Sequence, residues 1–138
     1  MSAEVNKQIV DGFDALARAG DVARLDELCT PDLVNHALAP GRPAGLVGTR
    51  EYLTTMAGQF EDDHWRSCLT VAEDDLVVQF GLRAGHWAGG DFLGFPTHSG
   101  NYARDVAFAY RLREGRIAER WAIRDDLTMI RQLGGIRL

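Results

Sequence analysis

The segment R-I-A-E-R-W-A-I-R-D-D-L-T-M-I-R-Q-L-G, residues 116–134, decides the fold of the C-terminal part of this chain. Its alternating apolar and polar residues predict a β-strand, and the residues that follow predict a short helix over 127–133. Side chains at alternate positions of a strand lie on the same face. Trp121, Ile123 and Asp125 are therefore expected on one face, which ends in a carboxylate.

Asp125 is the candidate acid/base residue of this segment. A carboxylate beside Trp121 and Ile123 loses hydration, so its pKa is expected to rise toward the range in which side chains transfer protons. Asp126 points to the other face and suits the N-cap of the following helix. Arg124 is also expected on that other face, where it does not counteract the shift.

Four upstream segments accompany the C-terminal pattern W-x-x-x-D-x-L and R-Q-L-G. They are L-V-N-H at residues 33–36, G-T-R-E-Y at 48–52, F-L-G-F-P at 92–96 and R-L-R-E-G-R-I-A-E-R-W at 111–121. In this order, the set resembles the SnoaL-like polyketide cyclases of the nuclear-transport-factor-two-like superfamily. The resemblance covers most of the chain. It implies a curved sheet wrapped as a cone, with helices closing a deep apolar pocket, although such scaffolds host many unrelated activities.

Length and composition restrict the class of protein. The 138 residues suit one domain over 1–138, with 46% hydrophobic and 25% charged residues. The net charge of −5 and the lack of a basic run make nucleic acid an unexpected partner. No apolar run is long enough to cross a membrane, and the start M-S-A-E-V-N-K favours the cytoplasm. Cys29 and Cys68 are expected to be free, buried and inert.

The order of elements predicts an α+β fold with a curved antiparallel sheet, an α+β barrel in the form of a cone. Helices are expected over residues 5–18 and 50–60, packed on the concave side of the sheet. A short strand is expected over 33–38, and after residue 64 the period changes to two. That change predicts strands over 64–73, 76–87 and 101–113, with residues 114–115 forming a hairpin to the last strand.

Two histidines and several aromatic residues complete the candidate site. His36 is a catalytic candidate or a hydrogen-bonded core histidine, and His86 either lines the pocket mouth or leaves the core. Phe92 and Phe95 are expected to form a lid or a subunit contact. The predicted pocket residues are Trp121, Ile123, His86, Trp87, Phe80, Phe92, Phe95, Trp65 and Phe108.

The remaining motifs argue against metal or nucleotide chemistry. H-x-x-x-H, C-x-x-C and H-x-E are missing from the sequence, as are G-x-G-x-x-G and the P-loop, so no metal and no cofactor is expected. Four arginines alternate with apolar residues on the predicted strands. They suit the outer face, an oligomer contact or, for one of them, an anionic substrate group: Arg104, Arg111, Arg120 and Arg124.

A carboxylate base in an apolar, aromatic pocket suits proton abstraction next to a carbonyl. The resemblance implies aromatic polyketide intermediates as substrates and Asp125 as the acid/base group. We therefore predict a cofactor-independent cyclase that closes a ring of a hydrophobic polyketide-like molecule by intramolecular aldol addition. A cofactor-free hydroxylase, isomerase, dehydratase or hydrolase, or a non-enzymatic ligand-binding module, remain alternatives. Apolar area at Val77 and Trp87 on the back of the sheet predicts a homodimer or higher homo-oligomer.

Overall fold

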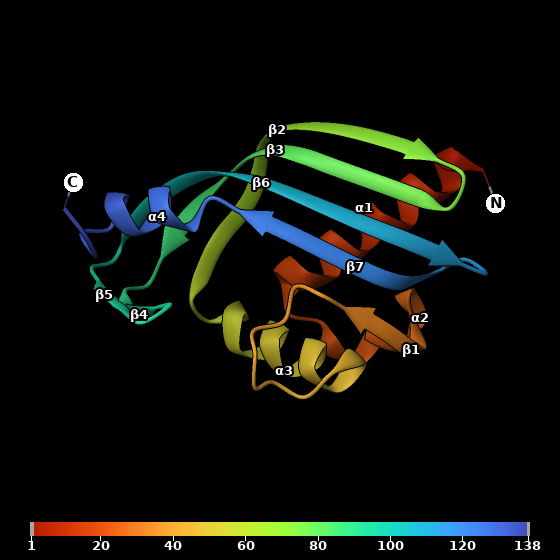
Figure 1. The fold of residues 1–138 in the computed structure, drawn as a ribbon, viewed down its shortest axis with the longest axis horizontal. Coiled ribbons are helices and arrows are strands. Elements are labelled where there is room, and N and C mark those ends of the chain that lie inside the picture. The colour runs from red at the N-terminus through yellow and green to blue at the C-terminus, as the bar shows by residue number, and fades with distance from the viewer. Residues whose placement is uncertain (1, 138) are drawn as a thin grey trace.

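The fold consists of a curved main sheet with helices α1 and α3 on its concave side and a small two-stranded sheet at one end (Figure 1). The computed structural model describes residues 2–137. The helices are α1 (Ala3–Ala19), the 3-10 helix η1 (Val22–Arg24), α2 (Leu25–Leu28), α3 (Gly45–Ala57) and α4 (Asp126–Gln132). The strands are β1 (Cys29–Asn35), β2 (Phe60–Glu73), β3 (Leu76–Trp87), β4 (Gly90–Phe92), β5 (Phe95–Thr97), β6 (Gly100–Arg113) and β7 (Arg116–Arg124). The predicted α+β class is confirmed.

The main sheet has the strand order β1-β7-β6-β3-β2. The strands predicted after residue 64 pair antiparallel, as expected, whereas β1 joins the edge of β7 in parallel. Two register shifts interrupt the pairing of β2, one of them between Glu61 and His64. Bulges of this kind bend a strand, and β2 curves from α3 into the sheet in Figure 1. The sheet is thus a cone that does not close into a barrel.

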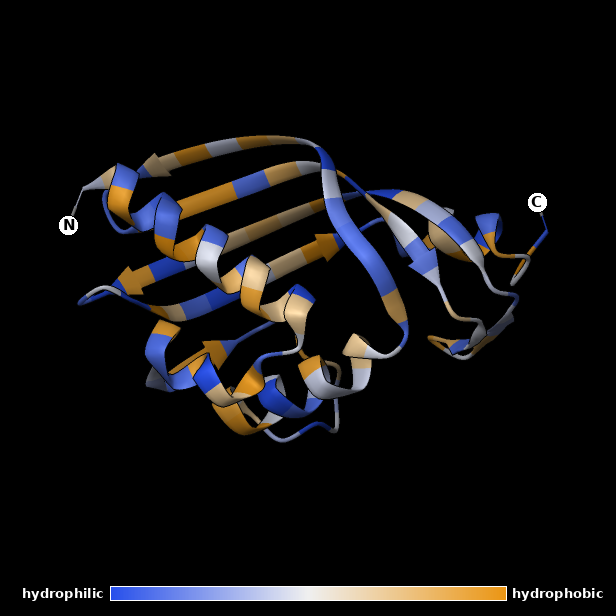
Figure 2. Ribbon diagram, turned by 180° about the vertical axis from the view of Figure 1, so that it is seen from behind, coloured by the Kyte–Doolittle hydropathy of each residue, from blue (hydrophilic) through white to orange (hydrophobic). Residues whose placement is uncertain are grey.

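Helix α1 covers the concave face of the sheet (Figure 2). Its buried side includes Val10, Phe13 and Leu16, which recur every three residues as in an amphipathic helix. Phe13 packs edge-on against Tyr110 of β6. The helix ends at Gly20, whose φ of 69° lies in the left-handed region that favours glycine.

A second, smaller core lies where α4 meets the β4–β5 hairpin. Trp87, Tyr102, Met129 and Leu133 form it, and Phe92 packs on Trp87. The Trp87 indole N–H donates to the hydroxyl of Thr97 at 2.8 Å, which ties the hairpin to the sheet. Figure 1 shows α4 and the hairpin at the end of the molecule away from α2. This hairpin therefore belongs to a core of its own.

The side chains that face the helices are the ones that were predicted on the back of the sheet, and the reverse also holds. On β3, Val77, Gln79 and Arg83 are buried on the concave side, whereas Val78 and Phe80 are exposed on the convex side. Trp87 is buried as well, so neither it nor Val77 contributes apolar area to the back of the sheet. The prediction assumed that the more apolar face is buried, but here hydrophobic residues occur on both faces.

The two cysteines differ in environment. Cys29 is buried, and burial raises the pKa of its thiol to about 12, which makes it inert as expected. Cys68 is exposed on β2, so the expectation that both are buried was wrong. No described helix is long and apolar enough to cross a membrane.

Candidate active site

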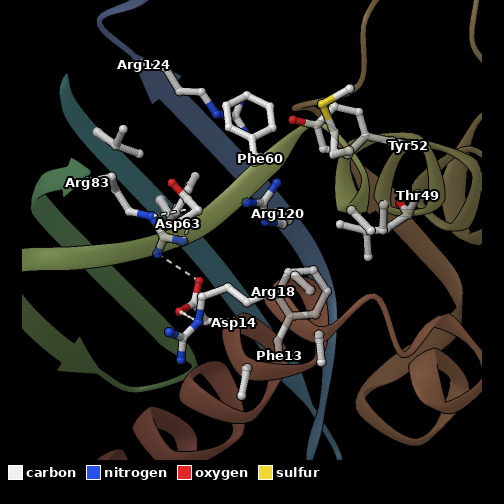
Figure 3. Close-up of a pocket in the computed structure, with 18 of the residues that line it drawn as sticks. Phe13, Asp14, Arg18, Thr49, Tyr52, Phe60, Asp63, Arg83, Arg120 and Arg124 are labelled. Carbon is white, nitrogen blue, oxygen red and sulfur yellow. Dashed lines mark hydrogen bonds and ion pairs between the residues drawn. The ribbon is translucent and has the colours of Figure 1, made fainter. Parts of the chain in front are cut away.

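A cavity of about 390 Å³ lies between the concave face of the sheet and helices α1 and α3 (Figure 3). Its walls combine aromatic rings such as Phe13, Phe60 and Phe108 with many charged side chains. Five arginines and three aspartates take part: Arg18, Arg83, Arg104, Arg120, Arg124, Asp14, Asp62 and Asp63. The cone encloses a pocket, as expected, but polar and charged side chains make up about as much of its lining as apolar ones do.

Arg83 is the centre of a buried ion-pair network. Its Nη1 lies 2.8 Å from Asp14 Oδ1, and its Nε and Nη2 both donate to Asp63 Oδ2. The guanidinium lies 4.7 Å from the ring centroid of Trp65. Burial disfavours the charged guanidinium, but Asp63 and Asp14 outweigh this effect and raise the pKa of Arg83. The network therefore holds two carboxylates in fixed positions at the cavity wall.

Asp63 is the more accessible of these carboxylates, with 25% of its side chain exposed against 15% for Asp14. It lies on β2 between the residues at which the register shifts, next to Asp62, whose φ is 54°. The Tyr102 hydroxyl donates to Asp63 Oδ1. Burial and this hydrogen bond raise the pKa of Tyr102, so the phenol stays protonated and remains a donor.

Arg120 and Arg124 come from β7 and enter the same cavity (Figure 3). Their guanidinium carbons lie 4.6 and 5.5 Å from the ring centroid of Phe108. Burial, the field of Arg120 and the field of Arg104 lower the pKa of Arg124. The prediction that these arginines lie away from the pocket was wrong, because the Arg120–Arg124 face of β7 is the concave one.

Asp125 has a different position and pKa from those predicted. It is the N-cap of α4: Oδ1 accepts from the Thr128 amide at 3.1 Å and Oδ2 from the Thr128 hydroxyl at 2.6 Å. These hydrogen bonds lower its pKa, so the expected rise was wrong. Asp126 does not take the cap and instead accepts from Arg104 at 2.5 Å. β7 ends at Arg124, one residue before the expected carboxylate.

His36 lies just beyond β1, outside the cavity lining. Its Nε2 is 2.7 Å from Glu119 Oε2, and its ring stacks on Trp121 at a centroid distance of 5.2 Å. Ile123 is 75% exposed on the convex face. With Phe80, it borders a shallow hollow there that also includes Asp125. The predicted catalytic pair and three predicted pocket residues, Trp121, Ile123 and Phe80, therefore lie outside the cavity.

The other predicted pocket residues divide among three environments. Phe108 lines the cavity, and Trp65 supports it by packing on Arg83. His86 hydrogen-bonds Asn101 at 3.1 Å and does not line the cavity. Three others belong to or border the second core: Trp87, Phe92 and the half-exposed Phe95.

Sequence reasoning missed the charged residues that line the cavity as site residues, above all Asp14, Asp63 and Arg83. One signal was available: Arg83 is a charged residue inside the largely apolar strand β3. Such a residue requires a buried partner or a function. Within residues 2–137, no three His, Cys, Asp or Glu side chains are arranged to hold a metal ion.

A curved sheet closed by helices around a cavity defines a nuclear-transport-factor-two-like fold. The sequence profile of the SnoaL-like polyketide cyclases matches residues 7–133, and the chain belongs to this family. No curated protein matches the sequence.

Solved structures share the fold along nearly the whole chain. TsrD from Streptomyces laurentii is 24% identical with a TM-score of 0.82, covering 99% of both chains. IdmH from Streptomyces antibioticus, described as a candidate polyketide cyclase, is 28% identical with a TM-score of 0.76, covering 94% of this chain and 98% of its own. AclR from Streptomyces galilaeus, described as a candidate hydroxylase, is 17% identical with a TM-score of 0.76, covering 99% of this chain and 100% of its own.

Proposed function

We propose that the protein is a cofactor-independent cyclase that closes a ring of a hydrophobic, polyketide-like molecule. Membership of the SnoaL-like family and the similarity to IdmH support this class of reaction. The observation that carries the proposal is the cavity of about 390 Å³, which presents the Asp63 carboxylate together with aromatic walls. Such an enclosure can fold a flexible substrate into a reactive conformation and supply a base.

Asp63 is the acid/base group of this proposal. It removes a proton from the carbon next to a substrate carbonyl, and the resulting enolate forms a carbon–carbon bond to a second carbonyl. That carbonyl becomes an alkoxide and takes the proton back from Asp63, so the reaction is balanced without a redox partner. Oδ1 can serve although it accepts from Tyr102, because a carboxylate oxygen accepts more than one hydrogen bond. Arg104, opposite Arg83 in the register of β3 and β6, lines the cavity and can stabilise the enolate.

Catalysis by Asp125 and His36 stays a prediction. It requires the substrate to bind outside the cavity, for Asp125 at the shallow hollow of the convex face. The lowered pKa of Asp125 and its two hydrogen bonds to Thr128 favour a capping role for this carboxylate.

The test of the proposed function is ring closure by the purified protein. Aromatic polyketide intermediates with an enolisable carbon and a free ketone are incubated with it, and the products are followed by liquid chromatography and mass spectrometry. We expect a cyclised product of unchanged mass, or of the mass less water, at a rate above the uncatalysed one. Binding of these compounds without any rate enhancement would contradict the cyclase proposal and favour the ligand-binding module.

We also propose that the protein forms a homodimer through the exposed convex face of the sheet. Its large exposed side chains are Leu69, Val71, Val78, Phe80 and Ile123. Patches of this kind usually meet a partner.

We expect light scattering to give about twice 15.2 kDa, and Ile123→Glu to shift the protein toward the monomer because it introduces a charge into the contact. Val47→Glu, at an exposed position of α3, is the matched control and should leave the mass unchanged. A parent protein of one-chain mass at micromolar concentration rules out the dimer.

A further inference from the structure

The charges of the cavity do not balance. Asp14 and Asp63 are bound by Arg83, and Asp14 also lies 3.4 Å from Arg18. Arg104 also lines the cavity, and it pairs with Asp126, which is not a lining residue. Asp62 is at the mouth, where 90% of its side chain is exposed. No acidic lining residue therefore remains in the interior to neutralise further cations.

Arg120 and Arg124 are the cations left over. Among the residues that the structure describes, neither forms an ion pair, and the Nε of Arg120 is buried without a hydrogen-bond partner. Arg120 is only 8% exposed. A buried guanidinium without a counter-charge is costly, because it loses hydration and gains no ionic partner.

The surroundings of the two arginines do not supply an anion. Phe13, Phe108 and Tyr110 surround the Arg120 guanidinium with aromatic rings. Burial raises the pKa of Tyr110, so its hydroxyl stays neutral at physiological pH. Rings of this kind contact the flat faces of a guanidinium and leave its N–H edge for hydrogen bonds.

We propose that Arg120 and Arg124 form a carboxylate-binding site, so that the ligand of this cavity is an aromatic or polycyclic carboxylic acid. Two guanidinium groups from one wall offer a set of N–H donors that matches the two oxygens of a carboxylate. Phe108, next to both, provides a stacking surface for an aromatic ring. This proposal specifies the substrate class of the proposed cyclase. It rests on the proposed function in one respect, namely that the cavity is the substrate site.

The test compares two probes of the same shape, 2-naphthoate and the neutral 2-naphthamide, by isothermal titration calorimetry on the full chain. We expect naphthoate to bind at least about tenfold more tightly, the usual effect of a charge-assisted hydrogen bond. Arg124→Gln should remove most of this preference, and Arg124→Lys should restore part of it. Arg111→Gln is the matched control, because Arg111 pairs with Asp75 outside the cavity and its loss should leave the preference unchanged.

Three results would overturn the site: equal affinity for the two probes, no naphthoate binding at millimolar concentration, or a parent-like preference in Arg124→Gln. Arg120→Gln is a second test and should act in the same direction. Arg124 is the primary variant because Arg120 is the more buried of the two, so its replacement disturbs the fold more. Failure of the two proposals is distinguishable. Naphthoate preference without ring closure refutes the cyclase and keeps the site, whereas turnover without naphthoate preference refutes the site and keeps the cyclase.

Discussion

Asp63→Asn should lower the rate of ring closure by about two to four orders of magnitude, the usual contribution of a general acid/base group. Asparagine has nearly the same size and can still accept a hydrogen bond from Tyr102, but it cannot take a proton from carbon. Arg83 keeps Asp14 as a charged partner, so the variant should remain folded. Turnover is measured under single-turnover conditions on a substrate that the parent protein cyclises, with circular dichroism to verify the fold.

Asp125→Asn is the matched control, because it makes the same chemical change outside the cavity. Asparagine caps helices about as well as aspartate, so α4 should be retained and the rate should stay near that of the parent. The opposite pattern, a large loss for Asp125→Asn and little for Asp63→Asn, would return the acid/base role to Asp125. It would also move the substrate to the convex face.

Much of the fold could be predicted because local sequence signals mark where the helices and strands begin and end. Leu76–Trp87 was predicted with the bounds that it has, since Asp74-Asp75 begins it with a turn and glycines follow it. Helix α1 was predicted within two residues at its start from its apolar spacing, and Gly20 ends it. α3 begins at Gly45, five residues earlier than expected. This start was missed because no side chain caps the helix there and because glycine is typical of loops. β1 also begins earlier, at Cys29, despite the proline at position 31.

The site could not be predicted because hydrophobicity does not identify the inner face of this sheet. On β7 the inward residues are Arg120 and Arg124, whereas Ile123 points to solvent. A rule that buries the apolar face therefore selects the wrong residues in the second half of the strand, although Ile117 near its start is buried. A shift of one residue exchanges the two faces of a strand. Local rules fail most often at functional sites. Recognising Arg83 as a charged residue in a central strand would have identified the concave face.

Arg83→Met should lower the free energy of unfolding by about 3 kcal/mol, the lower end of what the loss of one partner of a buried ion pair costs. Methionine fills a similar volume between Trp65 and Phe108 but leaves Asp14 and Asp63 without their cation. The lower end applies because both carboxylates retain some contact with water. Urea unfolding followed by fluorescence measures the change, and Arg83→Lys should recover part of it by restoring the charge.

Arg113→Gln is the control for this loss, since Arg113 pairs with Asp32 on the surface and such exposed pairs contribute little. A double-mutant cycle with Asp14→Asn separates the network from simple packing. If Arg83 and Asp14 act as one unit, the double variant should lose less than the sum of the two single losses, because the second change removes a carboxylate that is already unpaired. Additive losses, or a stability of Arg83→Met equal to that of the parent, would mean that the network does not hold the sheet to α1. The carboxylate of Asp63 would then lack the fixed position that its proposed role in proton transfer requires.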